Sequence, residues 1–172
     1  MASTRPAAVI AYTTWQSPLG EMILAASAAG LCGLWFTGQK YAPAKKSWPR
    51  RDDDPRLRTA IAQLQEFFGR RRRSFDLPLD LSSGTVFQRS VWRALQRIPA
   101  GQTASYGDLA RRVGRPQAAR AAAAAIGRNP LSILVPCHRV IGRDGSLTGY
   151  AGGLDRKAAL LALEGVSSAA RR

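Results

Sequence analysis

The chain has 172 residues, of which 45% are apolar, so it is long enough for one domain or two small ones with a buried core. Its 26 basic residues outnumber its 11 acidic ones, and the net charge of +15 attracts polyanions, nucleic acid first and an anionic membrane surface second. No apolar run approaches the roughly 20 residues of a membrane-spanning helix, so we expect no membrane anchor. The first residues lack the apolar region of a signal peptide, which predicts a cytoplasmic protein with reduced thiols.

The N-terminal part of the chain, residues 1–82, predicts a small α+β domain without chemistry of its own. Four segments show strand patterns: 9–15, 21–26, 31–36 and 75–81. Apolar residues at helical spacing predict a helix over residues 56–68. Cys32 has no acidic, basic or cationic neighbour in the sequence, which favours core packing. The four arginines at 70–73 are either a phosphate contact or, more commonly for such a run, a solvated loop.

Residues 83–172 predict a second, helical domain, which carries 14 basic residues against 4 acidic ones. Helical patterns cover four segments: 85–98, 105–113, 117–126 and 154–163. The second and third of these helices are joined by a short turn at residues 113–115, which has the form of a helix-turn-helix.

The helix predicted over residues 117–126 is almost entirely alanine. Only Gln117, Arg120 and Arg128 project from it or from its end, too few polar side chains to read a base sequence. A smooth helix with one protruding arginine fits binding to the DNA backbone in the minor groove, with Arg120 pushed into the base stack. The alternative is an alanine-rich core helix, chosen for its helix propensity.

Residues 135–140 contain the only histidine of the chain and one of its two cysteines. The thiolate is the reactive form of cysteine, and His138 and Arg139 offer a base and a positive charge beside Cys137. Apolar flanks predict a buried strand that is interrupted at Pro136. The alternative is a small buried cysteine next to a solvated His–Arg pair.

Two features of the last quarter point toward the same site. Glu164 ends the final predicted helix, where a carboxylate is unfavourable, so we expect a specific partner, and His138 is the natural one. The glycine-rich loop at residues 148–153 has backbone N–H groups that could cradle a flat ligand, or it serves only as a connector.

These residues together resemble the O6-alkylguanine-DNA alkyltransferase family of direct-reversal DNA repair proteins. The resemblance is close over residues 83–165 and looser over 9–81. It rests on segments in the family's order and spacing: Ser105-Tyr106-Gly107, Arg120, Asn129-Pro130, residues 136–140 and residues 149–154. It implies an α+β fold, with an N-terminal ribonuclease-H-like α/β domain and a C-terminal helical domain with a winged helix-turn-helix.

The resemblance also implies the reaction. The protein would flip O6-alkylguanine out of double-stranded DNA and transfer its alkyl group irreversibly to Cys137, once per molecule. It would need no cofactor and no metal, and O4 of thymine is a further candidate substrate atom. We expect a monomer, with cooperative loading on DNA left open.

Site roles follow by position from the same resemblance. Cys137 would accept the alkyl group, His138 would take its proton through a water, and Glu164 would orient the imidazole. Asn129 would brace the site by hydrogen bonding, and Tyr106 would protonate or polarise the guanine. The implied DNA contacts are Thr103, Ser105, Gln117, Ala118, Ala119, Arg120, Ala121 and Arg128, with Arg120 filling the hole left by the flipped nucleotide. The implied pocket walls are Tyr106, Val140, Tyr150, Ala151, Gly152 and Gly153.

The chain departs from the family pattern in places. Ala151 stands where many members have serine, Gly127-Arg128 differs from the commoner order, and the zinc ligands of some members are missing. Two other functions fit the same residues. One is a DNA- or damage-binding module in which the cysteine is incidental, and the other is a cysteine hydrolase that uses Cys137, His138 and Glu164 on an acyl substrate.

Overall fold

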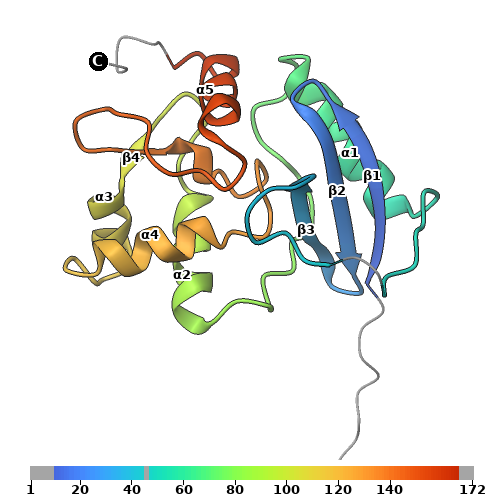
Figure 1. Cartoon of the computed structure of the whole chain (residues 1–172), viewed down its shortest axis with the longest axis horizontal. Coiled ribbons are helices and arrows are strands. Elements are labelled where there is room, and N and C mark those ends of the chain that lie inside the picture. Colours follow the sequence, from blue (N-terminus) through green and yellow to red (C-terminus); the bar gives the residue numbers. More distant parts are fainter. Residues whose placement is uncertain (1–9, 45–46, 167–172) are drawn as a thin grey trace, which may run out of the picture.

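A computed structural model describes residues 10–44 and 47–166, and in it an N-terminal sheet domain lies beside a C-terminal helical domain (Figure 1). The mixed α+β architecture expected from the sequence is confirmed. Among the described residues, no helix is long and apolar enough to cross a bilayer.

The N-terminal sheet is an antiparallel meander. Its strands are β1 (Ala11–Ser17), β2 (Gly20–Ser27) and β3 (Gly30–Phe36), in that order across the sheet. The helix α1 (Pro55–Phe68) packs on one face, and Asp54 caps it by accepting the Arg56 N–H at 2.9 Å. The α1 residues in this core are Leu57, Ala60, Leu64 and Phe67, which meet Met22, Leu24 and Ala26 of β2. The side chains between them in β2, Ile23 and Ala25, join Trp35 in a second, smaller cluster.

The prediction of a strand over residues 75–81 is wrong. This segment is irregular, and its backbone pairs with the sheet at an isolated bridge between Leu79 and Leu31. The carbonyl oxygen of Pro78 accepts the Leu31 N–H at 2.9 Å, but Pro78 has no N–H of its own to continue a ladder.

The C-terminal domain consists of short helices around a small parallel strand pair. Its elements are α2 (Val86–Leu95), β4 (Ala104–Ser105), α3 (Tyr106–Arg112), α4 (Ala119–Gly127), the 3₁₀ turn η1 (Cys137–Arg139), β5 (Val140–Ile141) and α5 (Leu154–Leu163). Reciprocal capping boxes start α2, at Thr85 and Gln88, and α3, at Ser105 and Asp108. The helix α4 has no side-chain cap and begins at Ala119, two residues later than predicted.

The expected strand around Cys137 is also wrong. Residues 131–136 form tight turns, in which the Leu134 N–H reaches the Ser132 carbonyl and the Cys137 N–H reaches the Val135 carbonyl, both at 2.8 Å. Ile133 adopts a left-handed backbone conformation, with φ at 71°. Apolar residues fill this segment because it is buried, and burial does not require an extended strand.

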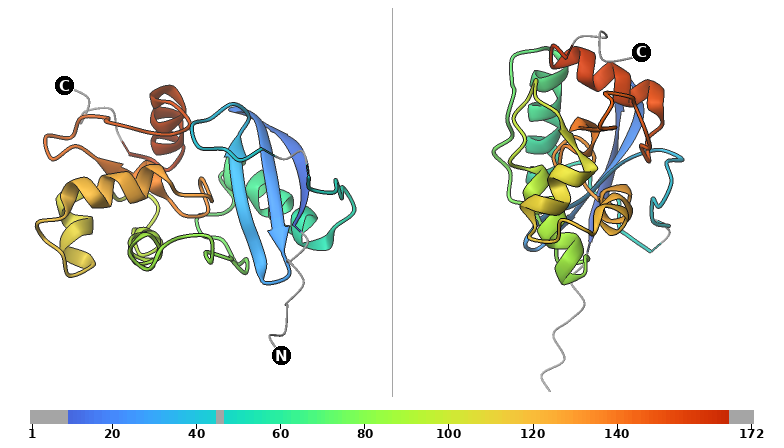
Figure 2. Two further views of the ribbon diagram at one scale, coloured as in Figure 1. Left: turned by 60° about the horizontal axis from the view of Figure 1, so that its bottom comes forward. Right: turned by 90° about the vertical axis from the view of Figure 1, so that its left-hand side faces the viewer.

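The two domains meet where the chain approaches Cys137. The outer edge of β3, the strand nearest the helical domain (Figure 1), holds this segment through two backbone hydrogen bonds. The Leu34 N–H donates to the Pro130 carbonyl at 2.8 Å, and the Ser132 N–H donates to the Leu34 carbonyl at 3.0 Å. At the same junction lies α5 (Figure 2), where Arg156 Nε donates to the Leu19 carbonyl at 2.9 Å. The sheet therefore fixes the backbone that leads into the cysteine.

Candidate active site

Cys137 lies at a cleft between α4, the loop before α5 and one loop of the N-terminal domain. The thiol side chain opens η1 directly after Pro136 and is only 6% exposed. The cleft has a volume of about 670 Å³, within the range of small-ligand pockets. Its walls are Lys40, Tyr41, Tyr106, Ala123, Ala124, Ile126, Gly127, Arg128 and residues 148–151.

His138, the next residue after the cysteine, forms a buried pair with Glu164. The distance from His138 Nε2 to Glu164 Oε1 is 2.8 Å, and both side chains are at most 2% exposed. Arg139 completes the group by donating to both oxygens of Glu164, at 2.7 Å from Nη2 to Oε1 and 3.0 Å from Nε to Oε2. The guanidinium also donates to the Ile98 carbonyl. These contacts explain why a carboxylate is tolerated at the end of α5, because Arg139 supplies the opposite charge that the helix end does not.

This arrangement leaves His138 with one free nitrogen. Burial lowers the pKa of His138, and although Glu164 opposes that effect, the ring is neutral near pH 7. Because Nε2 donates to the Glu164 carboxylate, Nδ1 carries the lone pair, and Nδ1 has no hydrogen-bond partner in the described part of the chain. Burial alone would raise the pKa of Glu164, but hydrogen bonds from His138 and Arg139 hold that pKa at about 2. A neutral imidazole oriented by a carboxylate can act as a general base.

Two polar groups act on the Cys137 thiol itself. Burial raises the pKa of Cys137, whereas the Asn129 amide and the charge of Lys157 favour the thiolate and work in the opposite direction. Lys157 is fully buried, and burial lowers its pKa to about 8. Its ammonium donates to the carbonyls of Thr148 at 2.8 Å and Gly149 at 3.2 Å, so it also fastens the loop that walls the cleft.

Asn129 fixes the turns before the cysteine. Its amide nitrogen donates to the Val135 carbonyl at 2.8 Å, and its amide oxygen accepts the Leu131 N–H at 2.9 Å. The side chain is 5% exposed, so neither bond competes with bulk water. Both ends of the amide therefore hold the irregular segment in one conformation.

Tyr106 and the loop after β5 form the opposite wall of the cleft. The Tyr106 hydroxyl donates to the Thr148 carbonyl at 2.8 Å, and the Thr148 hydroxyl lies 3.3 Å from the same phenol oxygen. A side chain at Gly152 would place its first carbon 2.8 Å from the Tyr150 ring and 3.0 Å from Phe36, so only glycine fits between them. The loop is thus closely packed and not merely a connector.

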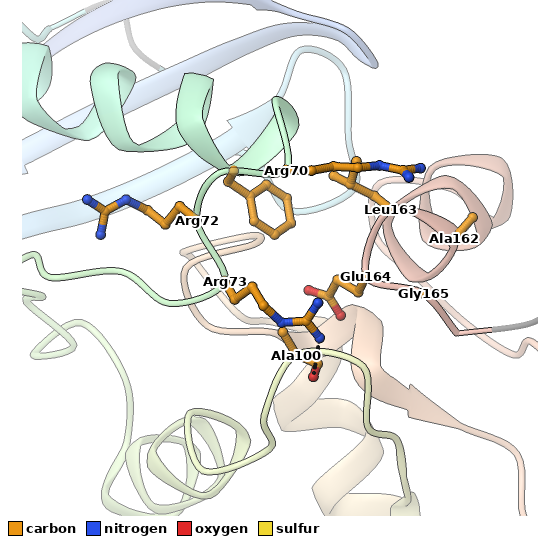
Figure 3. Close-up of a pocket in the computed structure, with 9 residues that line it drawn as sticks. Arg70, Arg72, Arg73, Ala100, Ala162, Leu163, Glu164 and Gly165 are labelled. Atoms are coloured by element: carbon orange, nitrogen blue, oxygen red, sulfur yellow. Dashed lines mark hydrogen bonds between the residues drawn. The ribbon is translucent and has the colours of Figure 1, made fainter.

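A second hollow lies on another side of Glu164 (Figure 3). It has a volume of about 210 Å³ and is lined by Arg70, Arg72 and Arg73 together with the end of α5. Arg73 donates to the Ala100 carbonyl at 3.0 Å, the bond drawn in Figure 3, and Arg72 pairs with Glu66 at 2.7 Å. Cys137 lines the larger cleft and does not line this hollow.

Comparison with known proteins agrees with this geometry. The family model described as the ribonuclease-like domain of 6-O-methylguanine DNA methyltransferase matches residues 10–81, and the model of its DNA binding domain matches residues 86–166. A methylated-DNA–protein-cysteine methyltransferase of Mycolicibacterium paratuberculosis is 50% identical, over 91% of this chain and 93% of the relative. The constitutive enzyme of Bacillus subtilis is 45% identical, over 91% and 96%. The crystal structure of Mycobacterium tuberculosis OGT in complex with DNA superposes with a TM-score of 0.82 at 45% identity, covering 90% of this chain and 92% of that one.

The chain belongs to the O6-alkylguanine-DNA alkyltransferase family.

The alkyltransferase site unites most, but not all, of the residues expected from the sequence. Tyr106, Tyr150 and Ala151 line the Cys137 cleft, together with Arg128. Val140 is buried in the core, and Gly152 and Gly153 line a different hollow beside Leu19 and Arg156. Four of the expected DNA contacts are exposed: Gln117, Arg120, Ala121 and Arg128. The other four are half-buried: Thr103, Ser105, Ala118 and Ala119. The Ser105 hydroxyl already serves the capping box of α3.

Three residues of this alkyltransferase were missed from the sequence. The sequence gives a weak indication of Lys157, because this residue shares one helical face with Leu161 and Glu164. A lysine on a buried helix face is rare and indicates a specific partner. For Lys40 and Tyr41 the sequence gives no indication, since they lie in a polar loop about 100 residues before the cysteine, and only the fold brings them to the cleft.

Proposed function

We propose that this protein repairs DNA by moving an alkyl group from O6 of guanine to the sulfur of Cys137, once per molecule. The observation that carries the proposal is a single thiol at the cleft, backed by a neutral histidine whose far nitrogen is held by Glu164. The relatives named methylated-DNA–protein-cysteine methyltransferase support the same reaction.

The proposed chemistry balances without a cofactor. The Cys137 proton passes through a water to His138 Nδ1, and the thiolate attacks the alkyl carbon in line with the bond to O6. That C–O bond breaks, its electron pair stays on O6, and the guanine takes up a proton, for which the Tyr106 hydroxyl at the cleft wall is the proposed donor. The product is a thioether with no acyl carbon for water to attack, so no later step frees the cysteine.

DNA is the proposed partner, bound through the exposed face of α3 and α4 as a winged helix-turn-helix. The proposal is supported by the DNA complex of the M. tuberculosis protein and by the alanine-lined surface of α4, which carries Arg120. A base inside a duplex is out of reach of the sulfur, so the nucleotide must be flipped, and exposed Arg120 is the proposed side chain that fills the gap. Arg120→Ala is expected to slow transfer at saturating protein more than it weakens binding; equal losses would contradict this role.

Further proposals concern the domain boundary, the oligomeric state and the cellular location. We place the boundary between the domains at residues 82–83, expect a monomer, and expect a cytoplasmic location, because the reaction needs a reduced thiol. Whether O4-alkylthymine reacts and whether loading on DNA is cooperative are questions for the same assay.

The test is to mix the protein with a duplex that contains one O6-methylguanine and to weigh the intact protein. We expect a gain of about 14 Da, one methylene, in a burst of one event per molecule. Continued turnover on an acyl substrate would support the hydrolase instead. Tight binding without any mass gain would support a non-enzymatic module.

A further inference from the structure

The N-terminal domain contributes two residues to the entrance of the Cys137 cleft, Lys40 and Tyr41. The loop that bears them is hydrogen-bonded to two segments of the C-terminal domain, one at Ser132 and one at Ala151. Gln39 Oε1 accepts the Phe36 N–H at 2.8 Å and the Ser132 hydroxyl at 3.4 Å, and the Lys40 N–H donates to the Ala151 carbonyl at 3.3 Å. Lys40 and Tyr41 are therefore built into the cleft rim.

Tyr41 has features that packing does not explain. Its backbone lies in the left-handed region, with φ at 64°, which is unfavourable for a residue with a side chain. The residue is 47% exposed, so little burial offsets that cost. Instead the ring lies against two cations: the Arg128 guanidinium carbon is 4.0 Å from the ring centroid, and Lys40 Nζ is 5.0 Å from it.

No acidic partner of the two cations is found in the part of the chain that the structure describes. Neither Lys40 nor Arg128 forms an ion pair within residues 10–44 and 47–166, although other exposed arginines, such as Arg50 and Arg111, do. Arg128 follows α4 as its C-cap, so the ring of Tyr41 links the end of the proposed DNA-binding helix to the N-terminal domain. Two unpaired cations on one ring, at the entrance of a cleft, form a site ready for an anion.

We propose that Lys40, Tyr41 and Arg128 form a phosphate clamp, which binds the DNA backbone at the extruded nucleotide. The inference rests on the proposed function, because a base inside the cleft is one sugar away from its own phosphate, which must then lie at the rim. Lys40 and Arg128 donate to the phosphate oxygens, and the Tyr41 ring holds the guanidinium in place before DNA arrives. The N-terminal domain thus takes part directly in holding the flipped nucleotide.

The experiment uses the full chain with Cys137→Ser, so that binding is measured without transfer. The dissociation constant for a duplex with one O6-methylguanine is determined over a series of salt concentrations. Lys40→Gln and Arg128→Gln are each expected to reduce the slope of log K against log salt by about 1, and to weaken binding about fivefold at about 0.15 M salt. Arg58→Gln, an exposed charge change on α1, is the matched control and is expected to leave the slope unchanged.

The tyrosine is tested separately. Tyr41→Leu keeps both charges but removes the ring, and is expected to weaken binding about two- to fivefold, whereas Tyr41→Phe keeps the contact and the affinity. All losses are expected to be smaller on an undamaged duplex of the same sequence, whose nucleotides remain stacked.

Lys40→Gln with the same slope as Arg58→Gln would overturn the clamp, and so would equal losses on damaged and undamaged DNA. Failure of the proposed function would give a different result: the wild-type protein, which keeps Cys137, would show no mass gain after incubation with the O6-methylguanine duplex. The salt slopes would still decide whether Lys40 contacts DNA.

Discussion

The two cysteines lie in regions that treat the same thiol differently. Cys32 is half-buried in β3, and burial, aided by the charge of Asp80, raises its pKa to about 11. Cys137 is more deeply buried, and burial raises its pKa too, but Asn129 and Lys157 act against that rise and His138 follows directly in the chain. Burial and a nearby carboxylate thus disfavour the thiolate of Cys32. What separates the two regions is the setting of each sulfur. Cys137 lines the cleft and is followed by His138, whereas Cys32 lies in β3, where burial and Asp80 outweigh the opposing charge of Arg56.

The largest expected effect comes from exchanging each cysteine in turn. Cys137→Ser should lower the rate of alkyl transfer at least about a thousandfold, because it removes the nucleophile. Cys32→Ser should leave the rate within about twofold, because Cys32 does not line the Cys137 cleft and burial disfavours its thiolate. Single-turnover transfer from an O6-methylguanine duplex measures both, and comparable losses would erase the distinction between the regions.

The buried carboxylate behind Cys137 should matter for folding as well as for reactivity. Glu164→Gln leaves Arg139 buried without its counter-charge and should cost about 3–5 kcal/mol in the free energy of unfolding. Glu66→Gln is the matched control, because Glu66 pairs with Arg72 at the surface and should cost no more than about 1 kcal/mol. Urea denaturation compares the two, and similar costs would show that Arg139 does not depend on Glu164.

The same carboxylate predicts how stability depends on pH. The pKa of Glu164 is about 2 in the folded protein, against an ordinary value of 4.5, so its contribution is fully present above pH 4.5 and is lost as the pH falls toward 2. The loss should reach about 3 kcal/mol relative to Glu164→Gln. Parallel denaturation curves of the two proteins over that pH window test the sign, and a constant difference would contradict it.

Lys157 offers a smaller and more specific test of the Cys137 environment. Lys157→Met keeps the buried volume but removes the charge, so the thiol pKa should rise further and transfer at pH 7 should slow about tenfold. Because the defect lies in the thiolate fraction, it should shrink as the pH is raised. A loss that is equal at every pH would assign Lys157 to holding Thr148 and Gly149 instead.

Sequence patterns predicted the elements whose burial has a simple period. The meander of β1–β3 and the helices α1, α2 and α5 follow from alternation and helical spacing. The segment before Cys137 escapes such patterns. Its apolar residues are buried in tight turns held by Asn129 and by the edge of β3, and neither contact produces a periodic pattern in the sequence.

Some residues of the candidate site could be predicted from the sequence, and others could not. Cys137 and His138 are adjacent in the chain, and a carboxylate at a helix end, as at Glu164, indicates a specific partner from the sequence alone. The roles of Lys40 and Tyr41 depend on one domain meeting the other, which a single sequence does not encode locally.

The most direct measurement of the central claim follows both cysteines in one molecule. The wild-type protein is incubated with one equivalent of O6-methylguanine duplex, digested, and each cysteine-containing peptide is weighed. We predict a gain of about 14 Da on the Cys137 peptide alone, approaching one per molecule. An unmodified Cys137, or methyl groups shared between Cys137 and Cys32, would contradict the account.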